Sequence, residues 1–200
     1  MAKRFVLDIA IILLKHQMQE LIKYGKKIVA AGLAHSHFGN VSKRVGDQML
    51  ISTTGSMLDE LEGQIVRVPI DPASPDELDV IASTELNVHR AIYKATSALA
   101  ILHGHSVYAV VESLLHEGQI VPEDSESIYF MHEIPVVTGG IGSDELARNT
   151  ASALRDHKGI IAQGHGTFAR GATVDEAFVI ISSIEHACMV KYLLDIAKKR

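Results

Sequence analysis

Short apolar runs with strand character alternate with helix signals along most of this chain, a pattern typical of a sheet covered by helices. The strand-like runs lie at 49–52, 65–70, 99–103 and 160–162. Helix signals mark the first thirty residues, 85–95, 107–115, 143–158 and the segment after Thr173. Because neither a linker nor a repeat divides these elements, we expect residues 1–200 to form a single α/β domain.

Polar and charged residues predict where several helices begin and end. Helix caps are expected at Ser83 or Thr84, at Ser143 and at Thr173. The helix from Ser143 is expected to run to Lys158, because acidic residues occupy its first turn and basic residues its last. The acidic stretch 117–133 is interpreted as a loop.

The charge balance argues against two classes of partner. Lys and Arg total 19 and Asp and Glu total 24, a net charge of -5, so we expect no basic surface for nucleic acid or an anionic membrane. The apolar run 5–14 is far shorter than the roughly 18 residues needed to span a bilayer, and we interpret it as the buried first turns of a helix. The single cysteine, Cys188, suits a reducing cytoplasm.

Two histidines close one of the predicted strands. Side chains two positions apart on a strand point to the same side, so His103 and His105 form a potential pair of metal ligands. His165, which lies between two glycines after another strand, is a candidate third ligand. Three imidazoles with one open position are a usual catalytic zinc arrangement. Since a His-x-His pair also occurs by chance, spacing alone leaves a metal site and unrelated histidines both open.

A second pair with the same spacing, His35-Ser36-His37, follows a helix end and enters a loop. We interpret these as polar loop histidines, with contact to a substrate as the alternative.

Small polar segments offer places where an anion could bind. Ser83-Thr84-Glu85 stands at a helix start, where free backbone N–H groups bind phosphate, and Gly39-Asn40 and Thr53-Thr54-Gly55 are similar short loops. Each is also explained as a cap or a turn. Glu85 has its own alternative, a first-turn acid that stabilises the helix dipole.

Taken in order, these motifs resemble the class II aldolase and adducin family over about residues 15–195. The matching segments are Gly39-Asn40-Val41-Ser42, Ile51-Ser52-Thr53-Thr54-Gly55, Ser83-Thr84-Glu85, His103-Gly104-His105 and Gly164-His165-Gly166. The resemblance implies a central, mostly antiparallel sheet flanked by helices. It also implies a homotetramer with active sites between subunits.

The resemblance further assigns roles to residues. It implies that a Zn²⁺ ion, or another divalent transition metal, is held by His103, His105 and His165, and that Glu85 is the catalytic acid/base. The implied phosphate-binding residues are Gly39, Asn40, Thr54, Gly55, Ser83 and Thr84. Aldolases of this family also use a tyrosine from a neighbouring subunit. Tyr129 is our candidate, with an aromatic side chain packed at an interface as the alternative.

The activity implied is retro-aldol cleavage of a ketose 1-phosphate, similar to fuculose 1-phosphate, into dihydroxyacetone phosphate and a short aldehyde. A sugar-acid phosphate decarboxylase or a pentulose-phosphate 4-epimerase is the alternative within the family. The segment His165-Gly166-Thr167-Phe168-Ala169 resembles the epimerases, whereas Glu85 stands where they carry aspartate. A non-enzymatic, adducin-like binding module would tend to lose these ligands, and here all are present.

Overall fold

One mixed sheet forms the centre of the computed structural model, which describes residues 2–74 and 77–199, with side chains of the first helix described at residue 9 and from residue 11. Its strands are β1 (Asn40–Val45), β2 (Gln48–Ser52), β3 (Ile65–Pro69), β4 (Ala100–Gly104), β5 (Gln119–Ile120), β6 (Ile134–Val137), β7 (Gly159–Ala162) and β8 (Gly166–Gly171). Their order is β3-β2-β1-β4-β8-β7-β6-β5. All neighbours pair antiparallel except β6 and β7, which confirms the expected sheet.

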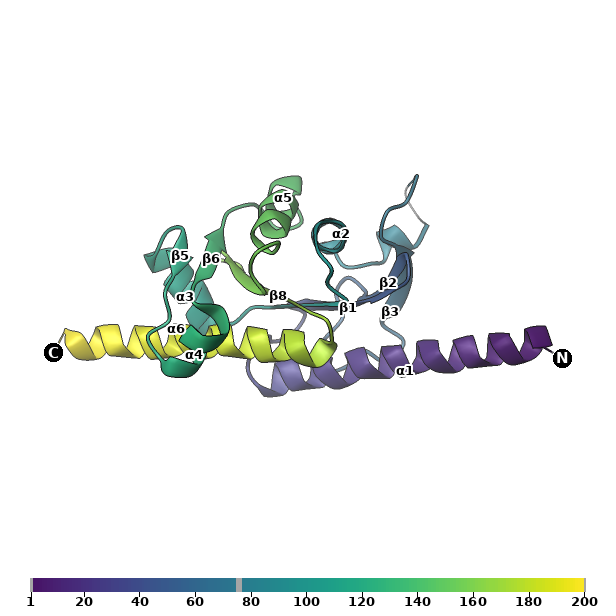
Figure 1. Ribbon diagram of the computed structural model, residues 1–200, viewed down its shortest axis with the longest axis horizontal. Helices are drawn as coiled ribbons and strands as arrows, with labels where there is room; N and C mark the ends of the chain where they lie inside the picture. Colours follow the sequence, from purple (N-terminus) through teal and green to yellow (C-terminus); the bar gives the residue numbers. More distant parts are fainter. Residues whose placement is uncertain (1, 75–76, 200) are drawn as a thin grey trace.

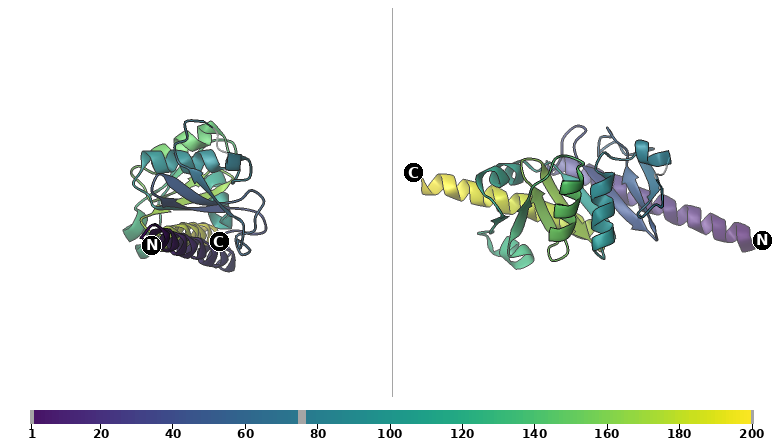
Figure 2. Two further views of the ribbon diagram at one scale, coloured as in Figure 1. Left: turned by 90° about the vertical axis from the view of Figure 1, so that its right-hand side faces the viewer. Right: turned by 90° about the horizontal axis from the view of Figure 1, so that it is seen from above.

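Helices cover both faces of the sheet (Figures 1 and 2). On one face lie α2 (Leu86–Ala95) and α5 (Asp144–Ala153), and on the other α1 (Ala2–Ala30), α3 (Val107–Leu115) and α6 (Val174–Lys198). The short helix α4 (Ser125–Met131) contacts α6, and a 3₁₀ turn, η1 (Glu77–Val80), follows β3. The result is three layers, with the sheet buried between the helices.

Alternation along the strands divides the interior into two cores. In β2, Met49 and Ile51 pack under α2 and α5, whereas Leu50 between them packs toward α1 and α6. In β4, Ile101 and Leu102 divide in the same way. Successive side chains on a strand point to opposite faces, so a strand buried on both faces is apolar at every position.

Helix α6 is long and apolar enough to cross a membrane by length and composition alone. Its buried residues, which include Ile180, Ile181 and Ile184, belong to the core beneath the sheet. The core therefore accounts for much of its apolar character.

The amino-terminal run expected to be buried is exposed at most of its described positions. Ile12 is 64% and Leu13 56% exposed, whereas Leu14 is partly buried and packs against the core. The side chains of residues 5–8 and 10 lie outside the described part.

Several element predictions were wrong. The segment 117–133 contains β5 and α4 rather than a loop, and Asp124 caps α4 by accepting a hydrogen bond from the Ser127 backbone N–H at 2.9 Å. Helix α5 ends at Ala153 and not at Lys158. The carbonyl of Ala153 accepts a hydrogen bond from His157 Nδ1 at 3.1 Å. Strands β1, β6 and β8 lie where no strand was predicted.

Two predicted caps are confirmed and one is wrong. Ser143 and Thr173 accept from the backbone N–H groups three residues later, at 3.1 and 3.0 Å. Helix α2 instead has Glu85 at its N-cap position without a side-chain cap, and Ser83 Oγ accepts from the Glu85 N–H at 3.3 Å. The Glu85 carboxylate is therefore free to point away from its own helix.

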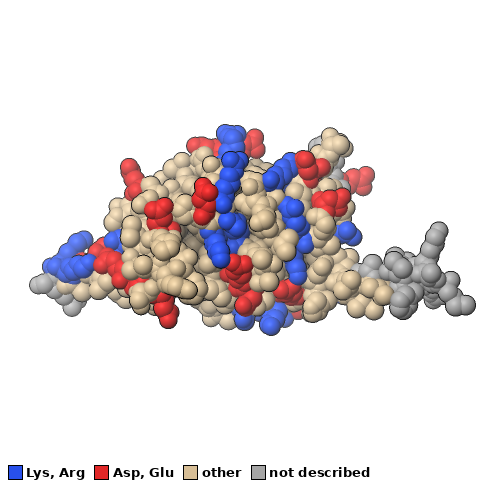
Figure 3. Space-filling view, viewed as in Figure 1, with Lys and Arg blue, Asp and Glu red and all other residues tan. Residues whose placement is uncertain are grey.

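Charged side chains of both signs are interspersed over the face shown in Figure 3. Several form ion pairs, such as the bidentate contact of Arg90 with Asp79 at 2.8 Å and that of Lys158 with Glu176 at 2.7 Å.

Candidate active site

Strand register brings distant segments to one end of the sheet. Asn40, the first residue of β1, lies opposite His103 near the end of β4, and His103 lies opposite Phe168 in β8. Strands β7 and β8 form a hairpin closed by the pair of Ala162 and Gly166, and His165 lies in its turn. Residues separated by more than sixty positions thus become neighbours because their strands pair.

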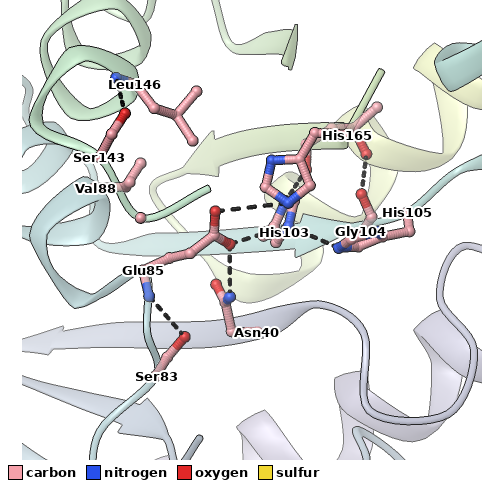
Figure 4. A network of polar contacts seen from close by, with 12 residues as sticks. Asn40, Ser83, Glu85, Val88, His103, Gly104, His105, Ser143, Leu146 and His165 are labelled. Atoms are coloured by element: carbon pink, nitrogen blue, oxygen red, sulfur yellow. Dashed lines mark hydrogen bonds and ion pairs between the residues drawn. The ribbon is translucent and has the colours of Figure 1, made fainter. Parts of the chain in front are cut away.

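The three predicted ligands converge at this end of the sheet (Figure 4). Their nearest ligand atoms all lie within 4.8 Å of one another, and the Nε2 atoms of His103 and His105 are 3.2 Å apart. The side chain of His103 is fully buried and that of His165 is 8% exposed. The His103-Gly104-His105 pair therefore faces one side, as the spacing predicted.

Burial keeps two of these imidazoles neutral. It lowers the pKa of both His103 and His105 to about 3, with a smaller contribution from neighbouring imidazoles. His103 Nδ1 donates to the Thr167 carbonyl at 2.9 Å, which leaves its Nε2 unprotonated and directed at the cluster. A neutral imidazole whose other nitrogen is held by a carbonyl is the form that binds a metal.

Glu85 faces the three imidazoles from the start of α2. Its Oε2 lies 3.1 Å from His103 Nε2, and its Oε1 lies 3.7 Å from His165 Nε2 (Figure 4). The residue is 2% exposed, and burial raises the pKa of its carboxyl group above the ordinary value. Among the described residues, Oε1 has no hydrogen-bond partner, so this oxygen is available to a ligand or a proton.

A buried chain of hydrogen bonds orients Glu85. Asn40 Nδ2 donates to Glu85 Oε2 at 2.9 Å, and Asn40 Oδ1 accepts from His89 Nε2 at 2.6 Å. His89 Nδ1 then accepts from the Ser42 hydroxyl at 2.6 Å, and Ser42 Oγ accepts from the Tyr93 hydroxyl at 2.8 Å. Burial lowers the pKa of His89 to about 3, so the ring stays neutral and its two nitrogens keep these opposite roles.

The role of His89, Ser42 and Tyr93 in orienting Glu85 was not predicted from the sequence. A signal was present, since Glu85, His89 and Tyr93 follow one another at a spacing of four, which places them on one side of a helix.

Backbone contacts fix the distance between the segments that carry the ligands. A Cβ atom on Gly104 would lie 2.6 Å from the Leu33 carbonyl oxygen, and one on Gly166 would lie 2.3 Å from the Gly104 carbonyl oxygen. Gly164, before His165, has φ of +66°, and its N–H donates to Ser113 Oγ of α3 at 3.0 Å. Glycine is required here for close packing and for a left-handed turn.

A cavity of about 190 Å³ opens above this cluster. It is lined by all six predicted phosphate-binding residues, Gly39, Asn40, Thr54, Gly55, Ser83 and Thr84, with Glu85, His105 and His165. Five further residues that were not predicted as part of the site also line it: His37, Phe38, Thr53, Ser56 and Ile141. The Phe38 ring stacks on His105 with centroids 4.9 Å apart.

The chain matches the Class II Aldolase and Adducin N-terminal domain over residues 19–192. It belongs to the class II aldolase and adducin family.

Individual relatives agree with this membership. The chain is 31% identical over 158 residues to the L-fuculose phosphate aldolase of Methanococcus maripaludis, covering 78% of this chain and 86% of that one. It is 28% identical over 184 residues to the 5-methylthioribulose-1-phosphate/5-deoxyribulose-1-phosphate aldolase of Escherichia coli, covering 83% and 82%. The crystal structure of L-fuculose-1-phosphate aldolase from Thermus thermophilus matches with a TM-score of 0.84 at 28% identity, covering 92% of this chain and 96% of that one.

Class II aldolases are metal dependent, and the geometry of this cluster fits a metal ion. Tetrahedral coordination at 2.0–2.1 Å per bond separates ligand nitrogens by about 3.3 Å, close to the 3.2 Å between His103 and His105 Nε2. An unprotonated His103 Nε2 and Glu85 Oε2 at 3.1 Å are both acceptors, so a proton or a cation is needed between them. His165 Nδ1 is also buried without a partner among the described residues.

The structure does not bring Tyr129 to the pocket of its own chain. Tyr129 lies on α4, is 78% exposed and packs edge-on against Phe130 at 5.3 Å. Any contact of Tyr129 with an active site of this class II aldolase must therefore be tested in an assembly of subunits.

Proposed function

We propose that this class II aldolase cleaves a ketose 1-phosphate, similar to fuculose 1-phosphate, into dihydroxyacetone phosphate and a short aldehyde. One observation carries the proposal. A small cavity is lined by His105, His165, the buried carboxylate of Glu85 and residues suited to a phosphate, and His103 completes the cluster of imidazoles. The two relatives named above support it, since one is an aldolase of L-fuculose phosphate and the other an aldolase of 5-methylthioribulose 1-phosphate and 5-deoxyribulose 1-phosphate.

The phosphate site that we propose consists of Gly39, Asn40, Thr54, Gly55, Ser83 and Thr84. Within the described chain, the backbone N–H groups of Gly55 and Thr84 make no hydrogen bond to other residues, and both residues are exposed. Thr54 and Ser83, which carry hydroxyl groups, also line the cavity. Free N–H groups near a helix start favour a phosphate, which would hold the reacting carbons over the imidazoles.

We propose that His103, His105 and His165 hold Zn²⁺. When bound, the ion would act as a Lewis acid on the substrate carbonyl, where negative charge develops during cleavage. Manganese, cobalt or iron could also bind a site of three imidazoles.

Glu85 is our candidate for proton transfer at the carbon beside that carbonyl. Its Oε2 accepts from Asn40, so Oε1 is the oxygen free to hold the proton. A carboxyl group whose pKa is raised by burial is closer to the range in which it can both accept and return a proton near neutral pH.

We further propose a homotetramer in which Tyr129 of one subunit serves the active site of the next. Helix α4 exposes Ile128, Tyr129 and Phe130 by 42%, 78% and 50%, and exposed apolar patches of this kind mark protein interfaces. The tyrosine would handle the proton on the aldehyde oxygen. If Tyr129 only packs at the interface, Tyr129→Phe will keep full activity. Light scattering will measure independently how many subunits assemble.

The apolar walls of the cavity favour a second candidate substrate. Phe38 and Ile141 line the cavity and are 54% and 70% exposed, so they offer contact to a carbon chain without hydroxyl groups. We propose a 5-deoxypentulose 1-phosphate as this candidate, because the E. coli relative is an aldolase of 5-deoxyribulose 1-phosphate.

We also place the enzyme in the cytoplasm, and its single, buried cysteine, Cys188, agrees with this placement.

Product analysis tests this function. The zinc-loaded protein is incubated with fuculose 1-phosphate and 5-deoxyribulose 1-phosphate, and dihydroxyacetone phosphate is measured by coupled reduction. We expect its release from at least one substrate and its loss after chelation. A product with inverted configuration at C4 would indicate an epimerase. Release of carbon dioxide from sugar-acid phosphates would indicate a decarboxylase. A metal-free protein of undiminished stability would indicate an adducin-like binding module.

A further inference from the structure

A second buried carboxylate lies outside the candidate active site, on α3. Glu112 is fully buried, and neither of its carboxylate oxygens has a hydrogen-bond partner among the residues that the structure describes. Burial raises the pKa of this group. Buried carboxylates are usually hydrogen-bonded or paired with a positive charge, so Glu112 indicates a place for a proton or a cation.

Two further ligand-bearing side chains face Glu112. His116 Nε2 lies 3.1 Å from Glu112 Oε2, and one carboxylate oxygen of Asp195, on α6, completes a set of three ligand atoms within 4.8 Å of one another. The side chains of His116 and Asp195 are 37% and 36% exposed, so the cluster opens to solvent on one side. They border a cavity of about 260 Å³ between α3 and α6.

The ends of two helices meet at this cluster. Helix α3 ends at Leu115, with His116 as its C-cap, and Asp195 lies in the last turn of α6. The carboxyl end of a helix carries partial negative charge, so both helices favour a cation there. At the other end of α3, Glu185 of α6 accepts from the N–H groups of Tyr108 and Ala109 at 3.0 and 2.9 Å, which fixes the two helices together.

We propose that Glu112, His116 and Asp195 form a second site for a divalent transition metal, which joins the end of α3 to α6. Two carboxylate oxygens and one imidazole nitrogen leave open positions for water, and they suit Zn²⁺ or Mn²⁺. The role of this site is structural. It uses none of the residues that we assign to catalysis.

A positively charged side chain of the protein, Lys191, lies beside the cluster and should weaken the binding of a metal ion. Lys191 Nζ is 3.5 Å from Asp195 Oδ2 and 3.5 Å from Glu123 Oε1. Its positive charge weakens binding of a dication, so removal of the charge should strengthen binding. A unit charge and a dication 4 Å apart repel by about 2 kcal/mol in a water-like medium, which corresponds to about thirtyfold in affinity.

Metal stoichiometry tests the proposal. The full chain is stripped with a chelator, titrated with Zn²⁺ by calorimetry, and analysed for zinc after gel filtration. We expect the wild type to bind two equivalents of Zn²⁺ per chain. His116→Ala and Asp195→Asn should each bind one equivalent and retain aldol cleavage. Lys191→Met should bind the second equivalent of Zn²⁺ about thirtyfold more tightly. His103→Ala should lose the other equivalent, which separates this proposal from the proposed function.

A matched control excludes adventitious binding to surface histidines. His186 is also on α6 and is 53% exposed, and its Nε2 lies 3.9 Å from Asp124, so His186→Ala should keep both equivalents. A wild type that binds only one equivalent in the zinc titration would overturn the proposal. So would a second equivalent that persists in both His116→Ala and Asp195→Asn. Circular dichroism of each variant checks that the helices are intact.

Discussion

Two His-x-His segments of this protein have the same spacing and different surroundings. His103 lies within β4 and His105 just beyond it, and their Nε2 atoms meet at 3.2 Å beneath a buried carboxylate. His35 and His37 flank Ser36, whose φ of +54° turns the chain out of any extended path, and both histidines are exposed. His37 Nδ1 donates instead to the Gly55 carbonyl at 2.7 Å.

The difference shows which surroundings suit a pair of histidines to a metal ion. In β4 the strand aligns both rings, the neighbouring strands cover them, and burial keeps them neutral. In the loop none of these conditions holds. His37 nevertheless lines the cavity, so the interpretation of these residues as simple loop histidines is incomplete for His37.

Removal of one buried ring should have the largest effect. His103→Ala should lose the metal of the active site and reduce activity by at least about 100-fold. Loss of a residue that only hydrogen-bonds a metal ligand already lowers metal affinity or activity by about 10–100-fold, and loss of the ligand itself should cost more. Metal per chain after gel filtration and release of dihydroxyacetone phosphate measure both effects. Unchanged metal content would show that His103 is not a ligand.

Glu85→Gln separates proton transfer from metal binding. The variant should keep its metal, since three imidazoles remain, while turnover falls by about 100-fold or more through loss of the proton carrier. Steady-state kinetics with measured metal content tests this expectation. If the variant is fully active, another residue moves the proton.

Acid should destabilise the metal-free protein through its buried rings. The pKa of His89 and of His103 is about 3 in the folded protein, below the ordinary value of 6.5, so the unfolded chain binds more protons as pH falls from about 6.5 toward 3. Each ring should remove about 2 kcal/mol of stability between pH 7 and pH 5. Glu85, with its raised pKa, has the opposite sign.

Urea unfolding at the two pH values measures this loss. In His89→Gln the loss should be about 2 kcal/mol smaller than in the wild type, because one neutral buried ring is gone. Equal losses in the two proteins would show that His89 does not remain neutral in the folded state.

Substitution in the exposed pair should have the smallest effect. His37→Ala should keep its metal and its kcat. It should raise KM for the sugar phosphate about fivefold, because the variant loses one hydrogen bond, which positions Gly55. His35→Ala, the control, should change neither metal content nor kinetics. Loss of metal in either variant would mean that the ligand pair was chosen wrongly.

The sequence predicted the residues that meet at the cavity, but not several of the strands and helices around them. The three histidines and the six cavity-lining residues lie in short motifs that carry their own chemistry, and the structure brings those motifs together. The buried support of Glu85 was missed because Ser42 and His89 meet only through strand pairing and helix docking. Helix α4 was missed because it buries only Ser127, so it has no apolar periodicity to detect.

The close contacts of Leu33, Gly104 and Gly166 have a consequence for metal choice. Since neither Gly104 nor Gly166 has room for a Cβ atom, the backbone segments that carry the three rings are held at a fixed separation once folding is complete. Such a rigid ring of nitrogens should accept zinc, cobalt or manganese in exchange for one another, and refuse calcium, which needs longer bonds and more oxygen atoms.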